Sequence, residues 1–594
     1  MCGIFCSLGS TLHVPPDTII ATRLQSRGPD STGTITSICT CNSTGESEEA
    51  PSTAFVTLHS TVLSLRGSKT TTQPYQDPSG KYTLCWNGEA WSITGKRPIG
   101  NDTEAVCKIL VDGLERLSVE DASATCTASA QARCIALALS QIAGPYAFVF
   151  FDQLRSRLFF GRDFLGRRSL LTKITPDGDL LISSVSDGNA RAGWTEVEAD
   201  GVYYVDLSPA RSASPGSTAS PQRWSIGFAP YHFRDTQGSS DRETLSVIPR
   251  LSLNKSTATV ATVLDESSSA VAELHQLLYN SVALRVLDIP EPPVSSSENH
   301  PAKLVILFSG GLDCTVLARL SHDLVPLTEP IDLLNVAFEN PRIHKRDAND
   351  GAIDESFYEL CPDRITGRQS YAELQRICPT RTWRFVAINV AYAENLQHRE
   401  IITSLMHPHN TEMDLSIASA LYFAARGQGV LNQTPDISSP CTTTARVLLS
   451  GLGADELFAG YTRHATAFKR ASLAGLLVEL ELDVSRLGKR NLGRDDRVMS
   501  HWGKEVRFPF LDEKLLTWAL DAPVTEKCGF GEIVPRTAEL GSAAELEPGK
   551  KVLRCLAWKL GMEQVAREKK RAIQFGARTA KMETGKTKGT HVLT

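Results

Sequence analysis

The feature that most constrains the fold is a series of short apolar runs in the second half of the chain, each followed by a helical pattern. KLVILF, IDLLNVAF, WRFVAINV and ARVLLS are apolar throughout instead of alternating with polar residues. Strands have this composition when both faces of their sheet are covered, as in parallel sheets flanked by helices. The runs predict an α/β domain, and the mostly helical sequence from about residue 461 predicts its helical C-terminal part.

The first 205 residues follow a different pattern, with short β-rich runs separated by turn residues. AFVTLHSTVLSL, KYTLCWNGE, GPYAFVFFD, RLFFGRD, DLLISSV and GVYYVDL are examples. Strands this closely spaced predict stacked antiparallel sheets. Two helical stretches, 15–28 and 102–117, interrupt them, so we expect an α+β domain.

Changes in composition mark the boundaries between these regions. SPARSASPGSTASPQ and the polar sequence up to about residue 260 predict a linker or surface excursion with little core. Residues 267–288 carry apolar residues at helical spacing, and EPPVSSSENHPAK predicts a second break. We expect domains at 2–208 and 266–594, joined by a linker or insertion at 209–265.

Composition also excludes several classes of partner. The chain has 594 residues, 41% of them hydrophobic, which is enough for more than one core. A net charge of −5 gives no electrostatic reason to expect nucleic acid or an anionic membrane as a partner. No apolar run approaches membrane-spanning length, and the N-terminus lacks the organisation of a signal peptide. We therefore expect a cytoplasmic protein without nucleic-acid or membrane partners; its oligomeric state has no signal in the sequence.

Cysteine usage points to one position. The 14 cysteines are scattered without a CxxC pair and matching partner, so we expect reduced thiols and no zinc site. Cys2, in MCGIFCSLG, follows the start methionine directly. Either it begins a buried first strand by accident, or removal of Met1 gives it a thiol and a free α-amine on one carbon. The amine can then take the thiol proton and create a nucleophile.

The run LVILFSGGLDC carries the strongest local signal for a ligand. A buried strand ends at Ser309, Gly310 and Gly311, and a helix is expected to begin near Asp313. Glycines let the backbone approach a ligand closely, and amide groups at a helix start favour an anion. The sequence lacks GxxxxGK[ST], so this is not a Walker A loop. It predicts a phosphate-binding turn of another type.

A second strand and turn, VLLSGLGADELFAGY, repeats this chemistry. Ser450 and Gly451 leave a predicted strand, and Asp455 and Glu456 open a predicted helix. Two such turns at neighbouring strand ends would surround one triphosphate with hydroxyls, amides and carboxylates. We expect Asp313 and Asp455 to supply oxygen ligands for Mg²⁺, which prefers one or two carboxylates together with phosphates.

Together the two turns resemble the asparagine synthetase branch of the ATP pyrophosphatases. SGGLDC and SGLGADE are similar to its phosphate and nucleotide signatures, and RFPFLDEKLLTWAL and GKKVLRCLAW to the helical end of its synthetase domain. NLGRDDR, WGKEVRFPFLD and KRAIQFGARTAKME resemble its asparagine synthetase domain-containing group most closely. Such enzymes adenylate a carboxylate with ATP, release pyrophosphate and let an amine displace AMP. The ATP-binding residues that the resemblance implies are Leu307, Ser309, Gly310, Gly311, Asp313, Ser450 and Gly451.

The first domain resembles the class II glutamine amidotransferases, in which an N-terminal cysteine attacks the side-chain amide of glutamine. MCGIF, RGPDSTG, WNGE, NDTE and GRDFLGRRSL are similar to their motifs, in the same order. The resemblance implies that Cys2 is the nucleophile and that Asn87 and Gly88 form the oxyanion hole. It implies that Asp102 holds the α-ammonium of glutamine. Cys6 lies two pleats along the same strand and is expected in the core.

One glutamine ligand is missing from its usual place. The family holds the glutamine carboxylate with an arginine where this chain carries Thr61 or Val62. Arg66, four residues beyond Val62, would share that face on a regular strand. It is either the replacement or a turn residue. The resemblance also implies a glutamine-binding role for Glu89.

Two departures from the family concern the synthetase turns. Cys314 replaces the hydroxyl of SGGxDS with a thiol that forms weaker hydrogen bonds, a change that is tolerable because backbone amides do most of the phosphate binding. Leu452 stands where asparagine synthetases carry a glutamate in the second turn. Since leucine offers no charge to the α-ammonium of an aspartate substrate, the substitution disfavours free aspartate as the acceptor.

A third departure concerns a late lysine that stabilises developing charge in the family. The aligned position is Ala572, and Lys570 and Arg571 are its neighbours. Adenylate breakdown develops negative charge and needs a cation, which either neighbour supplies after a small change of register. We expect Lys570, together with Glu456, to take part in this charge stabilisation.

These expectations define a fold and a function. The fold is an α+β N-terminal nucleophile domain with stacked antiparallel sheets, followed by an α/β parallel-sheet ATP-pyrophosphatase domain with a helical C-terminal part. The function is a glutamine-dependent amidotransferase that uses ATP and Mg²⁺ to make asparagine from aspartate. Two alternatives stay open: a different carboxylate substrate, or a binding or regulatory module that retains the fold and has lost synthetase activity.

Overall fold

The computed structural model describes residues 2–40, 53–67, 69–120, 127–189, 193–208, 224–234, 246–256, 263–292, 301–343, 356–434, 437–532, 545–582 and 589–593. The chain divides into two compact units. Unit 1 comprises Met1–Arg250 and Gly488–Gly503, and unit 2 comprises Leu251–Leu487 and Lys504–Thr594. The segment 488–503 thus belongs with unit 1, although the sequence places it inside the predicted domain 266–594. The predicted domains at 2–208 and 266–594 stay predictions.

Unit 1 is built on two six-stranded antiparallel sheets. The first has the order β12-β10-β11-β1-β3-β2, with bounds β1 Gly3–Gly9, β2 Ser31–Thr40, β3 Thr53–Val62, β10 Leu171–Ile174, β11 Leu180–Ser183 and β12 Thr195–Glu196. The second has the order β14-β13-β9-β8-β5-β4, with bounds β4 Tyr75–Gln76, β5 Tyr82–Gly88, β8 Tyr146–Asp152, β9 Arg157–Arg162, β13 Gly201–Asp206 and β14 Ile226–Pro230. Strands β6 Ser92–Ile93 and β7 Ile142–Ala143 pair separately. The predicted antiparallel sheets are confirmed.

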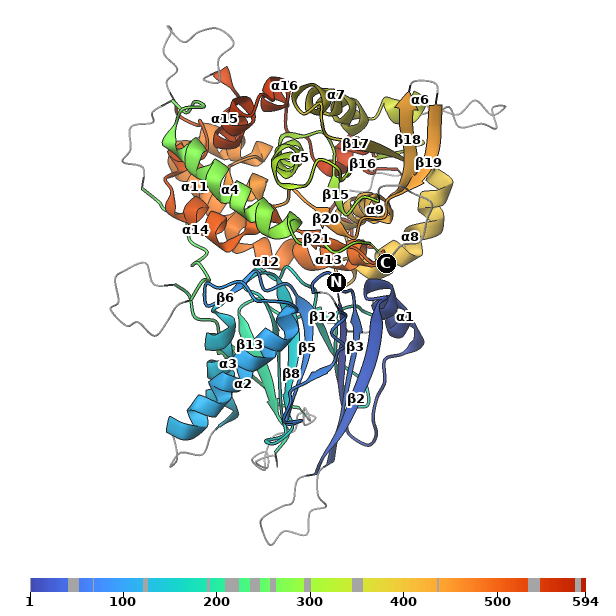
Figure 1. Ribbon diagram of the computed structural model, residues 1–594, viewed down its shortest axis with the longest axis vertical. Helices are drawn as coiled ribbons and strands as arrows, with labels where there is room; N and C mark the ends of the chain where they lie inside the picture. Colours follow the sequence, from blue (N-terminus) through green and yellow to red (C-terminus); the bar gives the residue numbers. More distant parts are fainter. Residues whose placement is uncertain are drawn as a thin grey trace. The chain divides into compact units, whose positions relative to one another are not determined.

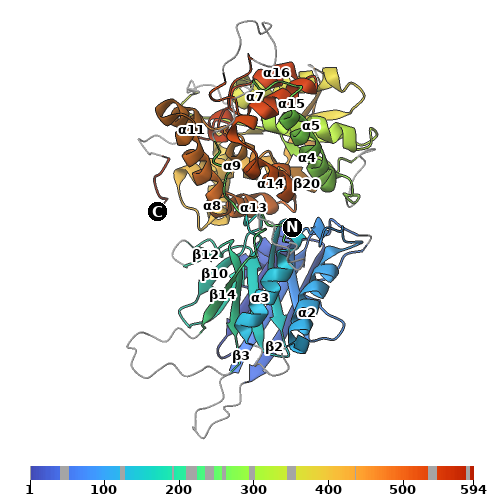
Figure 2. The same ribbon diagram turned by 90° about the vertical axis from the view of Figure 1, so that its left-hand side faces the viewer.

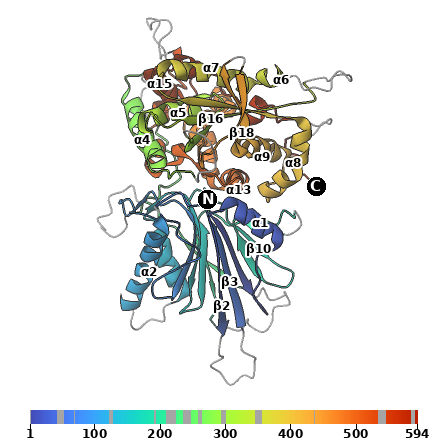
Figure 3. The same ribbon diagram turned by 45° about the vertical axis from the view of Figure 1, so that its right-hand side comes forward.

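The helices described with these sheets include α1 Thr18–Arg27, α2 Asp102–Glu120, α3 Ala128–Leu139 and, from the later segment, α13 Leu492–Ser500. Helices α2 and α3 lie side by side (Figure 2), and β2 and β3 form the long hairpin pair visible in Figure 3. Helix α1 begins where Asp17 accepts a hydrogen bond from the Ile20 amide at 2.8 Å, an N-cap that satisfies an otherwise unpaired donor. Both helices predicted from the sequence are therefore present.

The core of unit 1 lies between the two sheets. Ile4 and Leu58 of the first sheet and Val149 and Phe160 of the second are buried in one cluster. Cys6 belongs to this cluster and is fully buried, which confirms its predicted core position. Because β1 lies between β11 and β3 in the sheet, packing on both sides fixes the strand that follows Cys2 directly.

Unit 2 contains one seven-stranded sheet in the order β19-β18-β17-β16-β15-β20-β21. Its bounds are β15 Leu304–Leu307, β16 Ile331–Phe338, β17 Trp383–Val390, β18 Gln428–Thr434, β19 Ile437–Thr442, β20 Val447–Leu449 and β21 Glu505–Arg507. Strands β17, β16, β15, β20 and β21 are neighbours in this order, and each pair is parallel, as predicted. Strands β18 and β19 add an antiparallel edge that the sequence analysis did not predict, so the sheet is mixed.

Helices cover this sheet, and Figure 1 shows α4 and α5 side by side on it. The helices of this half of the chain are α4 Ser269–Val286, α5 Leu312–Leu324, α6 Ser356–Glu359, α7 Pro362–Ile377, α8 Tyr392–Met406, α9 Glu412–Arg426, α10 Ala454–Leu457, α11 Thr462–Ser485, α12 Leu487–Arg490, α14 Glu513–Asp521, α15 Lys551–Lys559, α16 Glu563–Arg567 and α17 Ile573–Gly576. Short 3-10 turns occur at Pro509–Leu511 and Val524–Glu526. Within the described ranges, no helix combines the length and apolar character needed to cross a bilayer.

The region 209–265 contains more structure than a linker with little core. Its described residues include β14, which pairs with β13, and the buried side chains of Trp224, Tyr231, Ile248 and Leu253. The Ser- and Pro-rich composition on the N-terminal side of this strand obscured a short apolar pattern. The expectation of little core was wrong for these residues.

Candidate functional site

Unit 1 places Cys2 at the start of β1, where two side chains fix its surroundings. Arg27, the last residue of α1, donates from Nε to the Cys2 carbonyl oxygen at 3.3 Å. Gln73 Nε2 lies 3.9 Å from the Cys2 sulfur, and Gln73 Oε1 accepts from the Trp86 amide at 2.6 Å. Gln73 therefore joins the thiol to β5, the strand that ends in Asn87 and Gly88. Gln73 was not among the site residues predicted from the sequence.

The Asn87 carboxamide is available for a ligand. Its side chain is buried, and neither its nitrogen nor its oxygen has a hydrogen-bond partner among the described residues. Buried polar groups without partners are rare because they cost free energy. An oxyanion hole requires an unpaired N–H donor, and Gln73 connects the strand that carries Asn87 to the Cys2 thiol. The position of Asn87 thus supports the predicted role, and Gly88 follows it in β5.

Asp102, Glu89 and Arg66 form a charged group at the same site. Asp102 Oδ2 accepts from the Ala90 amide at 2.7 Å and from Trp86 Nε1 at 3.2 Å. Arg66 Nη1 donates to the Ala90 carbonyl at 2.8 Å and lies 3.6 Å from Glu89 and 4.0 Å from Asp102. Arg66 therefore lies beside the predicted glutamine ligands.

Two properties of this charged group bear on ligand binding. Strand β3 ends at Val62, so Arg66 does not reach the site by continuing a regular strand, and that premise was wrong. Burial raises the pKa of Asp102, although the Ala90 amide and Arg66 oppose the shift. A positively charged ligand group next to Asp102 would favour the ionised form of this carboxyl group and lower its pKa again.

Helix α13 contributes a buried acid to this unit that the sequence analysis missed. Asp496 Oδ2 lies 2.9 Å from Arg27 Nη2 and accepts from the Ser169 amide at 3.1 Å. Arg168 Nη1 lies 3.7 Å from Asp496 Oδ1, and Ser500 accepts from Arg27 Nη1 at 2.5 Å. Arg27 and Arg168 belong to the RGPDSTG and GRDFLGRRSL motifs, and Asp496 to NLGRDDR. Three motifs far apart in sequence thus form one ion-pair group behind Cys2.

Replacement of Asp496 by asparagine should damage this arrangement. Loss of the charge leaves Arg27 buried without its carboxylate, so we expect the free energy of unfolding to fall by about 3–5 kcal/mol. Because Arg27 holds the Cys2 carbonyl, the kcat/KM for glutamine should fall by about 10- to 100-fold. Thermal denaturation and glutamate release measure the two effects.

Asp112→Asn is the matched control, because Asp112 forms an exposed ion pair with Lys108 on α2. Its expected change in stability is below about 1 kcal/mol. Equal stability of the Asp496 and Asp112 variants would contradict the structural role of the buried pair.

In unit 2, the first predicted phosphate turn connects β15 to α5. Gly310 has φ +80°, and a side chain there would collide with the Gly367 amide at 2.4 Å, so glycine is required. Ser309 Oγ accepts from the Gly311 amide at 3.3 Å and lies 3.8 Å from the Cys314 sulfur. Helix α5 begins at Leu312, one residue before Asp313, as predicted.

The second turn lies beside the first because β20 is the parallel neighbour of β15. Ser450 and Gly451 follow β20, and Asp455 and Glu456 lie in α10. A side chain at Gly451 would meet the Asp313 side chain at 2.8 Å, so the two turns are in direct contact. The predicted proximity of the two turns is thus present in the structure.

Lys550 joins the two acidic residues and was missed by the sequence analysis. Its ammonium lies 2.6 Å from Asp313 Oδ2 and 2.7 Å from Asp455 Oδ1. The lysine is buried and has φ +58°. Residues other than glycine rarely adopt this backbone conformation, and those that do are often found at functional sites. The quoted motif GKKVLRCLAW contains it, but spacing alone gives no reason to choose Lys550 over its neighbour Lys551.

A pocket of about 470 Å³ surrounds these groups. It is lined by Ser309, Gly311, Leu312, Asp313, Asp363, Thr366, Lys550, Arg554, Glu568, Lys569, Lys570 and Arg571. Burial raises the pKa of Asp363 to about 7, although Arg571 and Lys570 oppose the shift. With five cations among its lining residues, the pocket suits a polyanion. Leu307, the last residue of β15, leads into the first turn.

The structure also shows the positions of Lys570 and Arg571, the two cationic residues that precede Ala572. Lys570 forms an ion pair with Asp455, and Arg571 Nη1 donates to Thr366 Oγ1 at 3.2 Å. Ala572 is the N-cap of α17 and offers no charge. Burial raises the pKa of Asp455, but Lys550 and Lys570 outweigh it and hold this pKa well below its usual range. Lys570 and Arg571 thus both line this pocket, which is called the phosphate pocket below after the predicted phosphate turn at Ser309–Gly311.

Glu456 lies behind the turn and differs from Asp455 in its environment. Burial, reinforced by Asp455, raises the pKa of Glu456, and Tyr461 donates its hydroxyl to Glu456 at 2.5 Å. Glu456 is not among the residues that line the phosphate pocket. From this position we expect Glu456 to influence Asp455, its neighbour in α10, and not to contact a phosphate directly.

The donor set fits the Mg²⁺ expected from the two turns of the sequence. Asp313 and Asp455 supply carboxylate oxygens within reach of one cation, as their shared contact with Lys550 shows. Among the described residues, no group of three or more metal-ligating side chains occurs. Mg²⁺ commonly binds one or two carboxylates and completes its shell with phosphates and water, so two aspartates suffice.

Comparison with known proteins decides the family. A sequence model described as a glutamine amidotransferase domain matches residues 60–187, and one described as asparagine synthase matches residues 472–588. Asparagine synthetase domain-containing protein 1 of Gallus gallus is 32% identical over 677 aligned residues, which cover 100% of this chain and 99% of the relative. The chain belongs to the asparagine synthetase domain-containing protein family.

Other members of the asparagine synthetase domain-containing family match over most of their length. The Homo sapiens protein of this family is 32% identical, covering 98% of this chain and 96% of the relative. A Saccharomyces cerevisiae member is 32% identical, covering 90% and 86%. The chain therefore combines a glutamine amidotransferase domain with an asparagine synthase domain, and the latter implies the use of ATP.

Proposed function

We propose that this protein is a glutamine-dependent amidotransferase that activates a carboxylate with ATP and converts it to an amide. The observation that carries the proposal is the contact between two phosphate turns, which brings Asp313 and Asp455 to one lysine in a cationic pocket. Such a site suits pyrophosphate release from ATP, and unit 1 supplies the groups for making ammonia.

In the first reaction, the Cys2 thiol transfers its proton to the α-amine that removal of Met1 exposes. The thiolate attacks the side-chain carbonyl carbon of glutamine. Asn87 Nδ2 and the Gly88 amide donate to the oxygen as it becomes negative. The amide nitrogen takes the proton back from the α-ammonium group, the C–N bond breaks with release of ammonia, and water hydrolyses the thioester to glutamate. Asp102 holds the α-ammonium of glutamine, and Arg66 and Glu89 contribute to its binding.

In the second reaction, the acceptor carboxylate attacks the α-phosphorus of ATP and pyrophosphate leaves. The amide groups of Gly310 and Gly311 and the hydroxyl of Ser309 hold the phosphates, while Lys550 and Lys570 neutralise the charge that develops on the leaving group. Mg²⁺, when bound by Asp313 and Asp455, adds positive charge beside the phosphates. Ammonia attacks the acyl carbon of the adenylate, loses a proton, and AMP leaves as the amide forms.

The acceptor is the least defined reactant of this proposal. Aspartate is the acceptor that the family name suggests, with asparagine as product. Leu452, in the second turn, offers no charge where a glutamate would face an ammonium group. This substitution supports a second candidate, a carboxylate other than free aspartate.

One incubation tests the proposal. The purified protein is given glutamine, ATP and Mg²⁺, with and without aspartate, and glutamate, pyrophosphate and asparagine are measured separately. Pyrophosphate that appears only with aspartate supports asparagine synthesis. Glutamate without pyrophosphate favours another acceptor. Neither glutamate nor pyrophosphate would reject the enzyme in favour of a binding or regulatory module.

As the pH is lowered, glutamine binding should weaken at a higher pH than it would if it depended on a carboxyl group with an ordinary pKa. Ionised Asp102 is the form that attracts the glutamine ammonium, and burial raises its pKa. Binding is therefore complete above this raised pKa and is lost as the pH falls through it. The KM for glutamine, measured across the acidic range, should rise accordingly.

Asp102→Asn provides the control for this pH dependence. The variant should have a higher KM for glutamine that no longer changes over the same acidic range. A KM for the unmodified protein that stays constant down to the ordinary carboxyl range would contradict the role of Asp102.

A further inference from the structure

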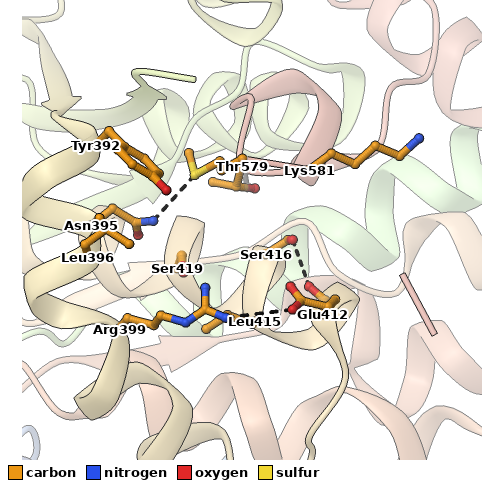
Figure 4. A pocket seen from close by; sticks show the side chains of 11 residues that line it. Tyr392, Asn395, Leu396, Arg399, Glu412, Leu415, Ser416, Ser419, Thr579 and Lys581 are labelled. Carbon is orange, nitrogen blue, oxygen red and sulfur yellow. Dashed lines mark hydrogen bonds and ion pairs between the residues drawn. The ribbon is translucent and has the colours of Figure 1, made fainter. Parts of the chain in front are cut away.

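A second pocket, between α8, α9 and the segment 579–582, shares no lining residue with the phosphate pocket (Figure 4). This pocket is partly enclosed by the protein and partly open to solvent. The proposed reactions use none of its residues. Its polar lining residues are Tyr392, Asn395, Arg399, Glu412, Ser416, Ser419, Thr579 and Lys581.

Opposite charges face each other in this pocket. Arg399 Nη2 of α8 and Glu412 Oε1 of α9 lie 3.8 Å apart, well beyond the ~2.7–2.9 Å of a direct charge-assisted hydrogen bond. Figure 4 shows them approaching from opposite sides, whereas the Lys581 ammonium extends away from them. A ligand that carries both a negative and a positive group can therefore contact each of them.

Two buried polar atoms also line the pocket without a partner. Asn395 and Thr579 are each more than nine-tenths buried. Asn395 Nδ2 contacts the Met582 sulfur at 3.5 Å, but Asn395 Oδ1 and Thr579 Oγ1 have no hydrogen-bond partner in the part of the chain that the structure describes. Buried polar atoms usually have partners, so these two atoms indicate a ligand with further polar groups.

The backbone beside Thr579 is held in an unusual conformation. Arg578 has φ +64° and Lys581 φ +54°, a region that residues other than glycine seldom adopt. Asn340 Nδ2 donates to the Arg578 and Ala580 carbonyls at 3.0 and 3.1 Å and fixes this segment. Such conformations persist where surrounding contacts impose them, commonly at ligand sites.

We propose that this pocket binds a small zwitterion of the free amino acid class. Arg399 takes its carboxylate, Glu412 takes its ammonium group, and Asn395 and Thr579 bind the remaining polar atoms. The inference goes beyond the proposed reactions, because it rests on the geometry of a separate pocket. One continuous stretch of backbone leads from Lys570 and Arg571 in the phosphate pocket through α17 to Thr579 in this one.

Equilibrium dialysis of the full-length protein tests the proposal. The probes are the proteinogenic L-amino acids except glutamine, which the first unit is proposed to bind, and neither ATP nor glutamine is present. At least one amino acid should bind, and Arg399→Gln should weaken it by about tenfold or more. Arg376→Gln is the matched control: it removes the same charge from an exposed position on α7 and should leave the affinity unchanged.

Glu412→Gln separates recognition from a merely structural effect. This variant should weaken the amino acid while leaving unchanged the affinity for its deaminated analogue, which has no ammonium group. Thermal denaturation confirms that each variant is folded. Failure of every amino acid to bind would overturn the proposal, as would equal loss of both compounds in the Glu412 variant.

Addition of ATP, Mg²⁺ and glutamine then distinguishes two roles for the bound amino acid, that of acceptor substrate and that of effector. Conversion of the bound amino acid to an amide identifies it as the acceptor, and recovery of the unchanged amino acid identifies it as an effector. The dialysis detects binding without turnover. A failure of the proposed amidotransferase reaction would therefore appear in the product assays and leave the binding result intact.

Discussion

Substitution of Cys2 by alanine is expected to abolish glutamate release while ammonia-dependent pyrophosphate release continues. Glutamate release should fall by about 10⁴-fold or more, as expected when a nucleophile is removed. The second reaction is unaffected in this variant because its groups, Asp313, Asp455 and Lys550, lie in unit 2. Glutamate and pyrophosphate are measured with glutamine and, separately, with an ammonium salt.

Two variants make this experiment specific. Cys2→Ser retains size and polarity but offers a weaker nucleophile, so it should also lack activity. Cys134→Ala removes a half-buried thiol from α3 of the same unit and should leave glutamate release unchanged. Loss of both reactions together in the Cys2 variant would contradict the separation of functions. Mass spectrometry of the active protein should show that Met1 is absent and that the new terminus is not acetylated.

Substitution of Asp313 by asparagine is expected to reduce pyrophosphate release while glutamate release continues. Pyrophosphate release should fall by about 10²–10³-fold, the usual effect of losing one group that stabilises charge in a transition state. Lys550 loses one of its two carboxylate partners but keeps Asp455, so the fold should persist. Glutamate release in unit 1 should remain within the normal range. Pyrophosphate and glutamate assays on the same preparation make the comparison.

Asp323→Asn is the control for this second experiment. Asp323 lies on the same helix α5 but forms a partly exposed pair with Arg319, so its loss should affect neither product. Pyrophosphate release by the Asp313 variant at the normal rate would exclude the phosphate pocket as the site of ATP activation.

The sequence predicted elements that have a strong periodic or compositional signal. The uniformly apolar runs identified β15, β16, β17 and β20 because burial on both faces leaves no alternation. The antiparallel strands β18 and β19 have no such signal, since QGVLNQT and ISSPCT mix polar and apolar residues. Strand β14 was hidden for a related reason, because its short apolar run follows a Ser- and Pro-rich stretch.

The site residues follow the same division. Asp313 was selected because its glycine turn has a local chemical signature, and Asn87 because its WNGE motif resembles one of the class II glutamine amidotransferases. Gln73, Asp496 and Lys550 act through partners that are distant in sequence, and only folding reveals those partners. Lys550 in particular is one of two adjacent lysines, and only its position between two carboxylates distinguishes it.

The inclusion of residues 488–503 in unit 1 has a consequence for biosynthesis. Arg27 and Arg168 share one carboxylate, Asp496, which lies 469 positions after Arg27 in the chain. The ribosome must therefore translate most of the message before the first unit can close, whereas domains near an N-terminus generally fold early during translation. A polypeptide that terminates at residue 250 would retain two buried guanidinium groups whose counter-ion has not been synthesised.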